Sequence, residues 1–306
     1  MDLSIIVINW NGERYLKNCL SKVFQACREI LYEVIVVDNA SEDTSLSYLR
    51  TQGGKIKLIE NSENIGFGKA ANQAVAKAKG KYIVIMNPDV EVDKESFRLM
   101  ISFLESNPQI GIVGPCILNP DGSLQRLGGG ASPLSLWASF CHYFFLFAIF
   151  KNISFFRGIY ISRLPNKPQS VGWVSGACFM VRRETFLRLD GFDEDFFMYS
   201  EDVDLCVRAK KRGWQIYYLP QAKVVHYIGG STRQAWDKII ARQGNNTVRL
   251  FRKHRSDKAL FFYRLIVSMG FFLRIAIVFL KYVIQQKQET KERIKFLNNC
   301  YQMAVR

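Results

Sequence analysis

Residues 3–89 alternate apolar runs with segments of helical spacing, and this order restricts the fold more than any other feature of the chain. The apolar runs predict buried strands, and the segments between them predict helices. Because such strands are apolar on both sides, the order predicts an α/β fold with a mostly parallel sheet covered by helices on both faces. The expected strands cover residues 3–9, 32–41 (with a turn), 56–61 and 81–89, and the expected helices cover residues 12–26, 42–52 and 66–80.

Polar side chains follow each of these expected strands: Asn9, Asp38 with Asn39, Asn61 with Asn64, and Asn87 with Asp89. In open parallel sheets, ligands bind beyond the carboxyl ends of the strands. Residues two apart in a strand point to the same side, so Asn87 and Asp89 reach the same space if the extended conformation continues through Pro88. No glycine-rich dinucleotide or P-loop motif follows a strand, which argues against those two kinds of site.

The composition limits the class of protein and of partner. With 306 residues and 48% hydrophobic residues, the chain is long and apolar enough for one large domain or a domain with an appendage. Its net charge of +15 favours an anionic partner: a nucleic acid, a nucleotide or phosphate-bearing substrate, or a membrane surface. Seven scattered cysteines without a C-x-x-C motif suggest neither a disulfide framework nor a zinc site, so we expect a reducing, cytosolic environment. The N-terminal residues do not fit a secretory signal.

Seven segments occur in a fixed order between residues 7 and 231: VINWNG, VVDNAS, ENIGFGKAAN, MNPDV, GWVSGACFMVRRE, GFDEDFFMYSEDVDLCVRAKKRGW and PQAKVVHYIGGS. In these segments the chain resembles the family 2 glycosyltransferases of the GT-A fold, and among them the bacterial rhamnosyltransferase-like group. The resemblance implies a nucleotide-sugar-binding half (residues 1–115) and an acceptor-binding, catalytic half (116–235) of one GT-A domain. Residues 236–306 are then a basic, amphipathic, membrane-associating helical region.

The resemblance also implies a metal-assisted, inverting transfer of a sugar from a nucleoside-diphosphate donor to an acceptor hydroxyl. A hard divalent cation, Mn²⁺ or Mg²⁺, stabilises the negative charge of the departing diphosphate. By resemblance, Asp89 and His226 are the metal ligands. The family usually has Asp-x-Asp where this chain has Asn87-Pro88-Asp89. Asn87 is therefore assigned to the donor nucleotide, and whether it contacts the metal stays open.

Other residues are assigned to the two substrates by the same resemblance. Asp38 is expected to bind the base or ribose of the donor, and an indole such as Trp173 can lie flat on a pyranose ring. Glycine at position 66 would let the backbone approach a ligand closely. The further donor-nucleotide residues are Asn9, Asn64, Gly66 and, as a weaker candidate, Arg242. The acceptor-binding residues are Trp173, Ser175 and Gly176.

Residues 200–213 predict a helix with Ser200 at its N-cap, acids in its first turn and Gly213 just beyond its end. The helix dipole alone would explain Glu201 and Asp202. The preceding residues 191–199 are both aromatic and acidic, which favours a carboxyl group with a raised pKa. By resemblance, Asp202 is the catalytic base and Glu201 helps to hold the acceptor. A single displacement inverts the anomeric carbon and needs only one base.

Two apolar stretches, residues 134–156 and 259–285, indicate contact with a membrane. The second is long enough to span a bilayer, but polar residues occupy an arc of roughly 140° on one side and leave the other side apolar. This pattern predicts an in-plane amphipathic helix, peripheral or monotopic, at the cytoplasmic face of the plasma (inner) membrane. Alternatively, these helices pack in a dimer, and the oligomeric state stays open. The polar arc consists of Arg264, Ser268, Arg274, Lys281 and Gln285.

Three functions are compatible with these features. The leading hypothesis is an inverting, metal-dependent glycosyltransferase that acts on a lipid-linked or polysaccharide acceptor, with dTDP-rhamnose as the expected donor and no role for nucleic acid. A membrane-associated nucleotidyltransferase would release pyrophosphate, and it would need an early basic, glycine-rich signature that the chain lacks. A non-catalytic nucleic-acid-binding protein would show polynucleotide affinity that falls steeply with salt, but no known binding motif is present.

Overall fold

The computed structural model describes residues 1–125, 129–130, 134–150, 153–161, 165–227, 246–285, 293–295, 297–298 and 301–302. The chain divides into two compact units. The first combines Met1–Gly129 with Arg163–Arg233, and the second combines Gly130–Ser162 with Gln234–Arg306. The predicted boundary between a nucleotide-sugar half and an acceptor half stays a prediction.

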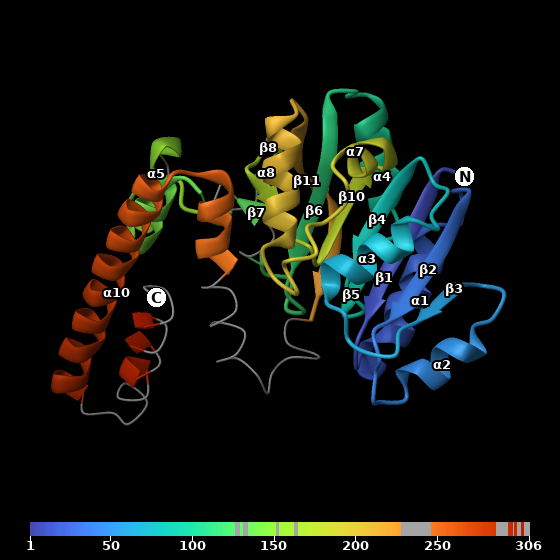
Figure 1. The fold of residues 1–306 in the computed structure, drawn as a ribbon, viewed down its shortest axis with the longest axis horizontal. Helices are drawn as coiled ribbons and strands as arrows, with labels where there is room; N and C mark the ends of the chain where they lie inside the picture. Colours follow the sequence, from blue (N-terminus) through green and yellow to red (C-terminus); the bar gives the residue numbers. More distant parts are fainter. Residues whose placement is uncertain are drawn as a thin grey trace. The chain divides into compact units, whose positions relative to one another are not determined.

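The first unit is built on a sheet whose described strands are β1 (Leu3–Asn9), β2 (Tyr32–Asp38), β3 (Lys57–Glu60), β4 (Tyr82–Met86), β5 (Val90–Val92), β6 (Ile110–Leu118), β8 (Gln169–Ser170), β10 (Cys178–Arg182) and β11 (Gln215–His226). Their order is β3-β2-β1-β4-β10-β6-β11-β5, with β8 also paired to β11 (Figure 1). Strands β1 to β4 are mutually parallel, as are β6 and β11. Strand β10 is antiparallel to β4 and β6, and β5 and β8 are antiparallel to β11. The predicted mostly parallel sheet is confirmed.

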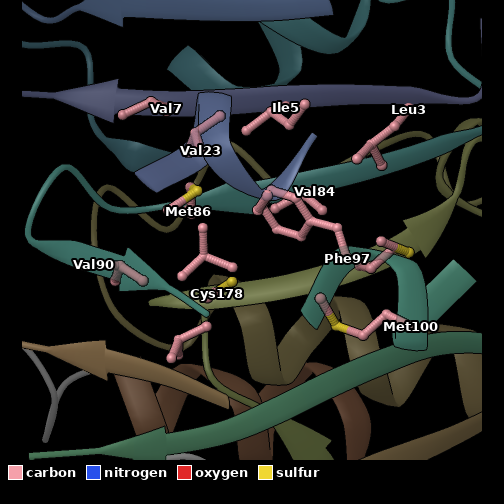
Figure 2. Close-up of a cluster of buried hydrophobic side chains, with 14 of the residues drawn as sticks. Leu3, Ile5, Val7, Val23, Val84, Met86, Val90, Phe97, Met100 and Cys178 are labelled. Carbon is pink, nitrogen blue, oxygen red and sulfur yellow. The ribbon is translucent and has the colours of Figure 1, made fainter. Parts of the chain in front are cut away.

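Helices cover both faces of this sheet because its strands are apolar on both sides. Leu3, Ile5 and Val7 belong to one core cluster, shown in Figure 2 beside Val84, Phe97 and other buried side chains. The intervening residues Ile6 and Ile8 point to the opposite face, since side chains alternate along a strand, and they are buried as well. The helices of the unit are α1 (Glu13–Ala26), α2 (Ser45–Thr51), α3 (Phe67–Val75), α4 (Ser96–Glu105), α7 (Arg183–Arg188) and α8 (Glu201–Lys211).

The predicted end of α8 is confirmed. Gly213 has φ +87°, a left-handed conformation that glycine adopts without strain, and Trp214 N donates to the carbonyl of Ala209. Ser200 is the N-cap residue as predicted, although its side chain makes no capping hydrogen bond. The short strand β9 (Trp173–Val174) precedes β10, and β7 (Gly129–Gly130) lies at the sequence boundary between the units.

The second unit contains α5 (Leu136–Tyr143), α6 (Leu146–Ile149), the 3₁₀ turn η2 (Ser154–Phe156) and the long helix α10 (Asp257–Gln285). Helix α10 packs against α5 at Gly270, where an added Cβ would lie 2.5 Å from Cβ of Tyr143. The Arg274 side chain donates to the carbonyl oxygens of His142 (3.0 Å) and Tyr143 (2.5 Å). Arg274 therefore binds two carbonyl oxygens at the end of α5, rather than facing water or lipid headgroups.

Within the described residues, one helix is long and apolar enough to cross a membrane, judged by length and composition alone: Asp257–Ile284 in α10. The side of α10 opposite Arg274 is apolar, as the sequence predicted, and its side chains are exposed. They include Phe261, Phe262, Leu265, Met269, Phe272, Phe279, Leu280 and Val283.

Candidate active site

The strand directions bring most of the predicted site residues to one edge of the sheet. Asn9 and Asp38 end β1 and β2 and are directly opposite each other in the register. His226 ends β11, which runs parallel to β6. Strand β10 runs the other way and begins at this edge, with Cys178 opposite Met86 at the end of β4. The segment before β10, which contains Ser175 and Gly176, therefore lies at the same edge.

The segment from Asn87 to Asp89 does not stay extended. Strand β4 ends at Met86, and Pro88 and Asp89 form a turn before β5. The sequence pattern placed Asn87 and Asp89 on the same side of a strand only if the chain stayed extended through Pro88, and it does not. The reason is that β5 reverses direction to pair with β11, so the chain must turn between the two strands. Asn87 N donates to the carbonyl of Ala177 (3.0 Å), which links the end of β4 to the start of β10.

Asp89 and His226 face each other at this edge. Nε2 of His226 lies 3.3 Å from Oδ1 of Asp89. Pairing of β5 with β11 holds them there, with His226 opposite Val90 and Tyr227 N donating to the Asp89 carbonyl (3.0 Å). Asp89 is buried, and its Oδ1 accepts no hydrogen bond from any described residue. An unpaired buried carboxylate oxygen is costly, so this oxygen is available to a ligand.

These two side chains fit a divalent cation. Two ligands on adjacent positions of an octahedral ion, each at about 2.1 Å, lie about 3.0 Å apart, close to the observed separation. Among the described residues, no group of three or more His, Cys, Asp and Glu side chains could hold a metal. A site with two protein ligands suits an ion whose remaining positions are taken by water and substrate phosphates.

The carboxylate of Asp202 is bound by two backbone amides. Val203 N donates to Oδ1 and Gly176 N donates to Oδ2, both at 2.7 Å. Burial raises the pKa of Asp202, while these two hydrogen bonds favour its charged form and oppose the rise. Gly176, which donates to Asp202, is followed in the chain by Ala177, whose carbonyl accepts from Asn87 N. Through these two hydrogen bonds, Asp202 is connected to the end of β4.

Within the described part of the chain, Glu201 lacks the pair of amide donors from neighbouring residues that Asp202 has. Its side chain is buried, and Oε2 has no hydrogen-bond partner among the described residues. Burial, and then the neighbouring charge of Asp202, raise the pKa of Glu201 well above its ordinary value. When the two carboxyl groups hold one proton, it therefore resides on Glu201 and leaves Asp202 as the anion.

Asn9 and Asp38 form a buried polar cluster. Asn9 Nδ2 donates to Asp38 Oδ1 (2.7 Å) and to Ser45 Oγ (2.9 Å). Asp38 also accepts from the backbone N (3.0 Å) and hydroxyl (2.7 Å) of Ser41. In this structure these bonds shape the loop after β2, and the expected contact of Asp38 with the donor nucleotide stays a prediction.

The turn at Asn64 and Gly66 is linked to this cluster through Asn39, whose Nδ2 donates to Asn64 Oδ1 (3.0 Å). Asn64 Oδ1 accepts from Gly66 N (3.0 Å), and Phe67 N donates to the Phe197 carbonyl (2.8 Å). Gly66 has φ +89°, and a Cβ there would lie 2.4 Å from the Phe197 carbonyl oxygen, so glycine is required. The turn therefore packs against the segment that leads into Glu201 and Asp202.

The remaining predicted residues differ in their surroundings. Trp173 is only 8% exposed, so its indole ring lies within the protein in this structure, and its contact with an acceptor stays a prediction. Ser175 Oγ accepts from Ala177 N (3.2 Å). Arg242 lies outside the described residues.

One residue beside the site was not predicted: Gln125, whose Oε1 lies 2.7 Å from Nδ1 of His226. It belongs to no recognised motif, and only the fold places it there.

A mostly parallel sheet with helices on it, the Asp89–His226 pair and the buried Asp202 carboxylate at one edge is the arrangement expected of a GT-A-like enzyme. Residues 4–189 match the model of glycosyl transferase family 2, and the chain belongs to this family. It is thus a glycosyltransferase, as the sequence predicted. The fold agrees, since the Pyrobaculum calidifontis mannosyltransferase PcManGT, in complex with GDP-Man and Mn²⁺, has a TM-score of 0.62 at 15% identity, over 99% of this chain and 86% of that one.

Two relatives are rhamnosyltransferases. The N-acetylglucosaminyl-diphospho-decaprenol L-rhamnosyltransferase of Mycobacterium tuberculosis is 29% identical over 264 residues, which cover 82% of this chain and 85% of the relative. Rhamnosyltransferase WbbL of Escherichia coli is 27% identical over 263 residues, 82% of this chain and 93% of the relative. The predicted resemblance to a rhamnosyltransferase-like group is confirmed, and the nucleotidyltransferase and nucleic-acid hypotheses gain no support.

Proposed function

We propose that the enzyme transfers a rhamnosyl residue from dTDP-rhamnose to a hydroxyl of a lipid-linked saccharide, with inversion and with the help of a divalent cation. The proposal depends on one observation: the Asp89–His226 pair and the Asp202 carboxylate lie at the same edge of the sheet. The names of the two relatives support rhamnose as the sugar, and the Mycobacterium relative's name supports a lipid diphosphate carrying N-acetylglucosamine as the acceptor.

Asp202 is the base in this proposal. It accepts the proton of the acceptor hydroxyl while the acceptor oxygen forms a bond to the anomeric carbon. The bond from that carbon to the diphosphate oxygen breaks, and its electron pair leaves with the nucleoside diphosphate. Because the carboxylate is held by Gly176 N and Val203 N, it is oriented before the acceptor binds. Glu201, in its protonated form, can donate a hydrogen bond to the acceptor.

Asp89 and His226 are the residues that would hold the cation, which neutralises charge on the leaving diphosphate when bound. A carboxylate such as Asp89 suits both Mn²⁺ and Mg²⁺, whereas imidazole is a better ligand for a transition-metal ion than for Mg²⁺, so of these two ions the pair favours Mn²⁺. Asn9, Asp38, Asn64 and Gly66 are assigned to the nucleotide, because they lie at the carboxyl ends of the first strands or in the turn beside them.

We also propose that the enzyme works at the cytoplasmic face of the inner membrane. The exposed apolar side of α10 and the net charge of +15 both suit a surface of anionic lipid. A lipid-linked acceptor presents its sugar at this surface, so an in-plane helix would keep the enzyme close to its substrate.

The test uses purified protein, Mn²⁺ and a panel of nucleotide sugars, with and without a polyprenyl-diphosphate N-acetylglucosamine acceptor in mixed micelles. We expect dTDP release from dTDP-rhamnose to accelerate when acceptor is added, and the product to carry one additional deoxyhexose by mass spectrometry. Removing the metal with EDTA should stop transfer, and Mn²⁺ should restore it better than Mg²⁺. Transfer from a different donor would correct the sugar, and full activity in EDTA would contradict the role of the metal.

A further inference from the structure

Gln125 is a buried amide, 4% exposed, that touches His226 at two points. Its Oε1 lies 2.7 Å from Nδ1 of the ring, and its Nε2 donates to the His226 carbonyl oxygen (3.2 Å). Nε2 also donates to Oδ1 of Asn119 (3.1 Å). The residue sits where the chain turns back after β6, with its backbone N bonded to the Ile117 carbonyl. The side chain thus lies behind the proposed metal ligand, on the side away from Asp89.

A chain of hydrogen bonds with one possible direction fixes the orientation of this amide. The Asp121 carboxylate can only accept, and it accepts from the Ser123 hydroxyl (2.6 Å). The Ser123 oxygen in turn accepts from Asn119 Nδ2 (2.9 Å), which leaves Asn119 Oδ1 as the acceptor for Gln125 Nε2. The His226 carbonyl, the second partner of Nε2, is also only an acceptor. Flipping the Gln125 amide would place its oxygen against both acceptors.

The orientation of Gln125 determines which ring nitrogen of His226 carries the proton. Since Gln125 Oε1 is an acceptor, Nδ1 must be the donor, and neutral His226 then has no proton on Nε2. Nε2 therefore presents its lone pair to Asp89 Oδ1 at 3.3 Å. Two electron-rich atoms at this distance repel each other unless a cation lies between them.

We propose that Gln125 is a positioning residue that holds His226 as the Nδ1–H tautomer, with Nε2 free to bind the cation. This inference rests on the proposed function, since it assigns a role toward the metal that the function uses. A hydrogen-bond acceptor behind a metal-binding histidine fixes the orientation of the ring and increases its basicity.

Nitrogen NMR of the ¹⁵N-histidine-labelled protein tests the tautomer directly, without metal. The chain has three histidines, so the His226 signals can be assigned by their loss in His226→Asn. At about pH 8.5, well above the ordinary histidine pKa, we expect Nδ1 protonated and Nε2 unprotonated in the wild-type protein. A proton on Nε2 instead would overturn the inference, whether or not the protein binds metal.

Variants of Gln125 test the consequence for the metal. Gln125→Met keeps the length of the side chain but removes the acceptor, and we expect Mn²⁺ affinity, measured by calorimetry or EPR without substrate, to fall roughly 10- to 100-fold. Gln125→Glu keeps an acceptor for Nδ1–H but loses the two hydrogen bonds that Nε2 donates, so it should retain the tautomer and more of the affinity than Gln125→Met does. Asn107→Leu is a matched control, since it removes an amide that donates to the Phe103 carbonyl (2.8 Å) at the opposite end of β6. It should leave Mn²⁺ affinity unchanged.

The outcomes separate this inference from the proposed function. If wild type binds Mn²⁺ and folded Gln125→Met binds it equally well, the role of Gln125 is wrong and the function stands. If wild type does not bind Mn²⁺, the metal part of the function is wrong, and the NMR experiment still decides the tautomer. If Gln125→Met does not fold, Gln125→Glu and the wild-type tautomer carry the test.

Discussion

Two adjacent carboxyl groups at the start of α8 differ in their hydrogen bonds, and this difference predicts different effects of mutation. Asp202→Asn removes the proposed base and should lower transfer by roughly 10²- to 10⁴-fold, with donor affinity unchanged. Glu201→Gln imitates the protonated acid that burial favours, so it should lower turnover less than about tenfold at neutral pH. Turnover with saturating acceptor measures both. Equal losses in the two variants would contradict the assignment, as would near-normal turnover in Asp202→Asn.

Glu201 also predicts a dependence of stability on pH. Its pKa is raised in the folded state, so the folded protein binds this proton more tightly than the unfolded chain does. The resulting stabilisation is complete below the ordinary glutamate pKa and is lost as pH rises through the raised pKa of the folded state. The glutamine in Glu201→Gln has no proton to lose in this pH range. The difference in Tm between this variant and wild type should therefore shift in favour of the variant as the pH is raised. Parallel Tm curves for the two proteins would show that Glu201 is not a buried acid.

The residues of the site were predictable to different degrees. Asp89 and His226 follow apolar strands, and parallel strands bring such residues to one edge, so the sequence pattern together with the family resemblance was enough to place them at one edge. Gln125 carried no signal, because a glutamine in a polar turn is ordinary. Its contact with His226, 101 residues away, exists only once β6 and β11 pair.

At the scale of elements, the continuous apolar run Tyr82–Met86 was sufficient to predict β4. Strand β5 was missed because Val90–Val92 is too short to show a period, and its partner is more than a hundred residues later in the chain. The antiparallel direction of β10 was not predictable either. A buried apolar strand looks the same in both directions, and only its connections determine which one it takes.

The contact of α10 with α5 allows a test at this scale. Arg274 donates to two carbonyls at the end of α5, and hydrogen bonds to charged groups are worth about 1.5–3 kcal/mol. Arg274→Met should therefore increase hydrogen exchange of the last turn of α5, by an amount equivalent to about 1.5–3 kcal/mol. Lys281→Met, an exposed change on the same helix, should have no such effect. Equal exchange in both variants would mean that Arg274 does not stabilise α5.

For the molecule as a whole, the exposed apolar residues need an explanation. Soluble proteins rarely expose large contiguous apolar patches, yet one side of α10 presents phenylalanine, leucine and methionine over most of its length. Other exposed aromatic residues of the same unit are Trp137, Phe150 and Phe155. A lipid surface would cover these side chains, and it is also where a lipid-linked acceptor is found.

This proposal predicts how the enzyme binds vesicles. Each large apolar side chain that enters the bilayer contributes about 1.5–3 kcal/mol, so Phe272→Glu with Leu280→Glu should remove most of the affinity. Flotation with vesicles of zwitterionic or anionic lipid measures this affinity. The wild-type protein should bind the anionic vesicles more strongly, and this preference should become smaller as the salt concentration increases. The matched control is Leu31→Glu with Leu187→Glu, two exposed leucines of the first unit, which should still float.

Activity then separates membrane binding from catalysis. The α10 double variant should hydrolyse the donor at the same slow rate as wild type and should transfer to a short, water-soluble acceptor analogue. The reason is that Asp89, His226 and Asp202 all lie in the first unit, away from the two changed residues in the chain. With the acceptor embedded in vesicles, its transfer rate should fall together with its binding. If the variant instead floats like wild type, α10 does not bind lipid. If the double variant that floats like wild type also differs from wild type in oligomeric state, the apolar side of α10 is an interface between two copies of the chain.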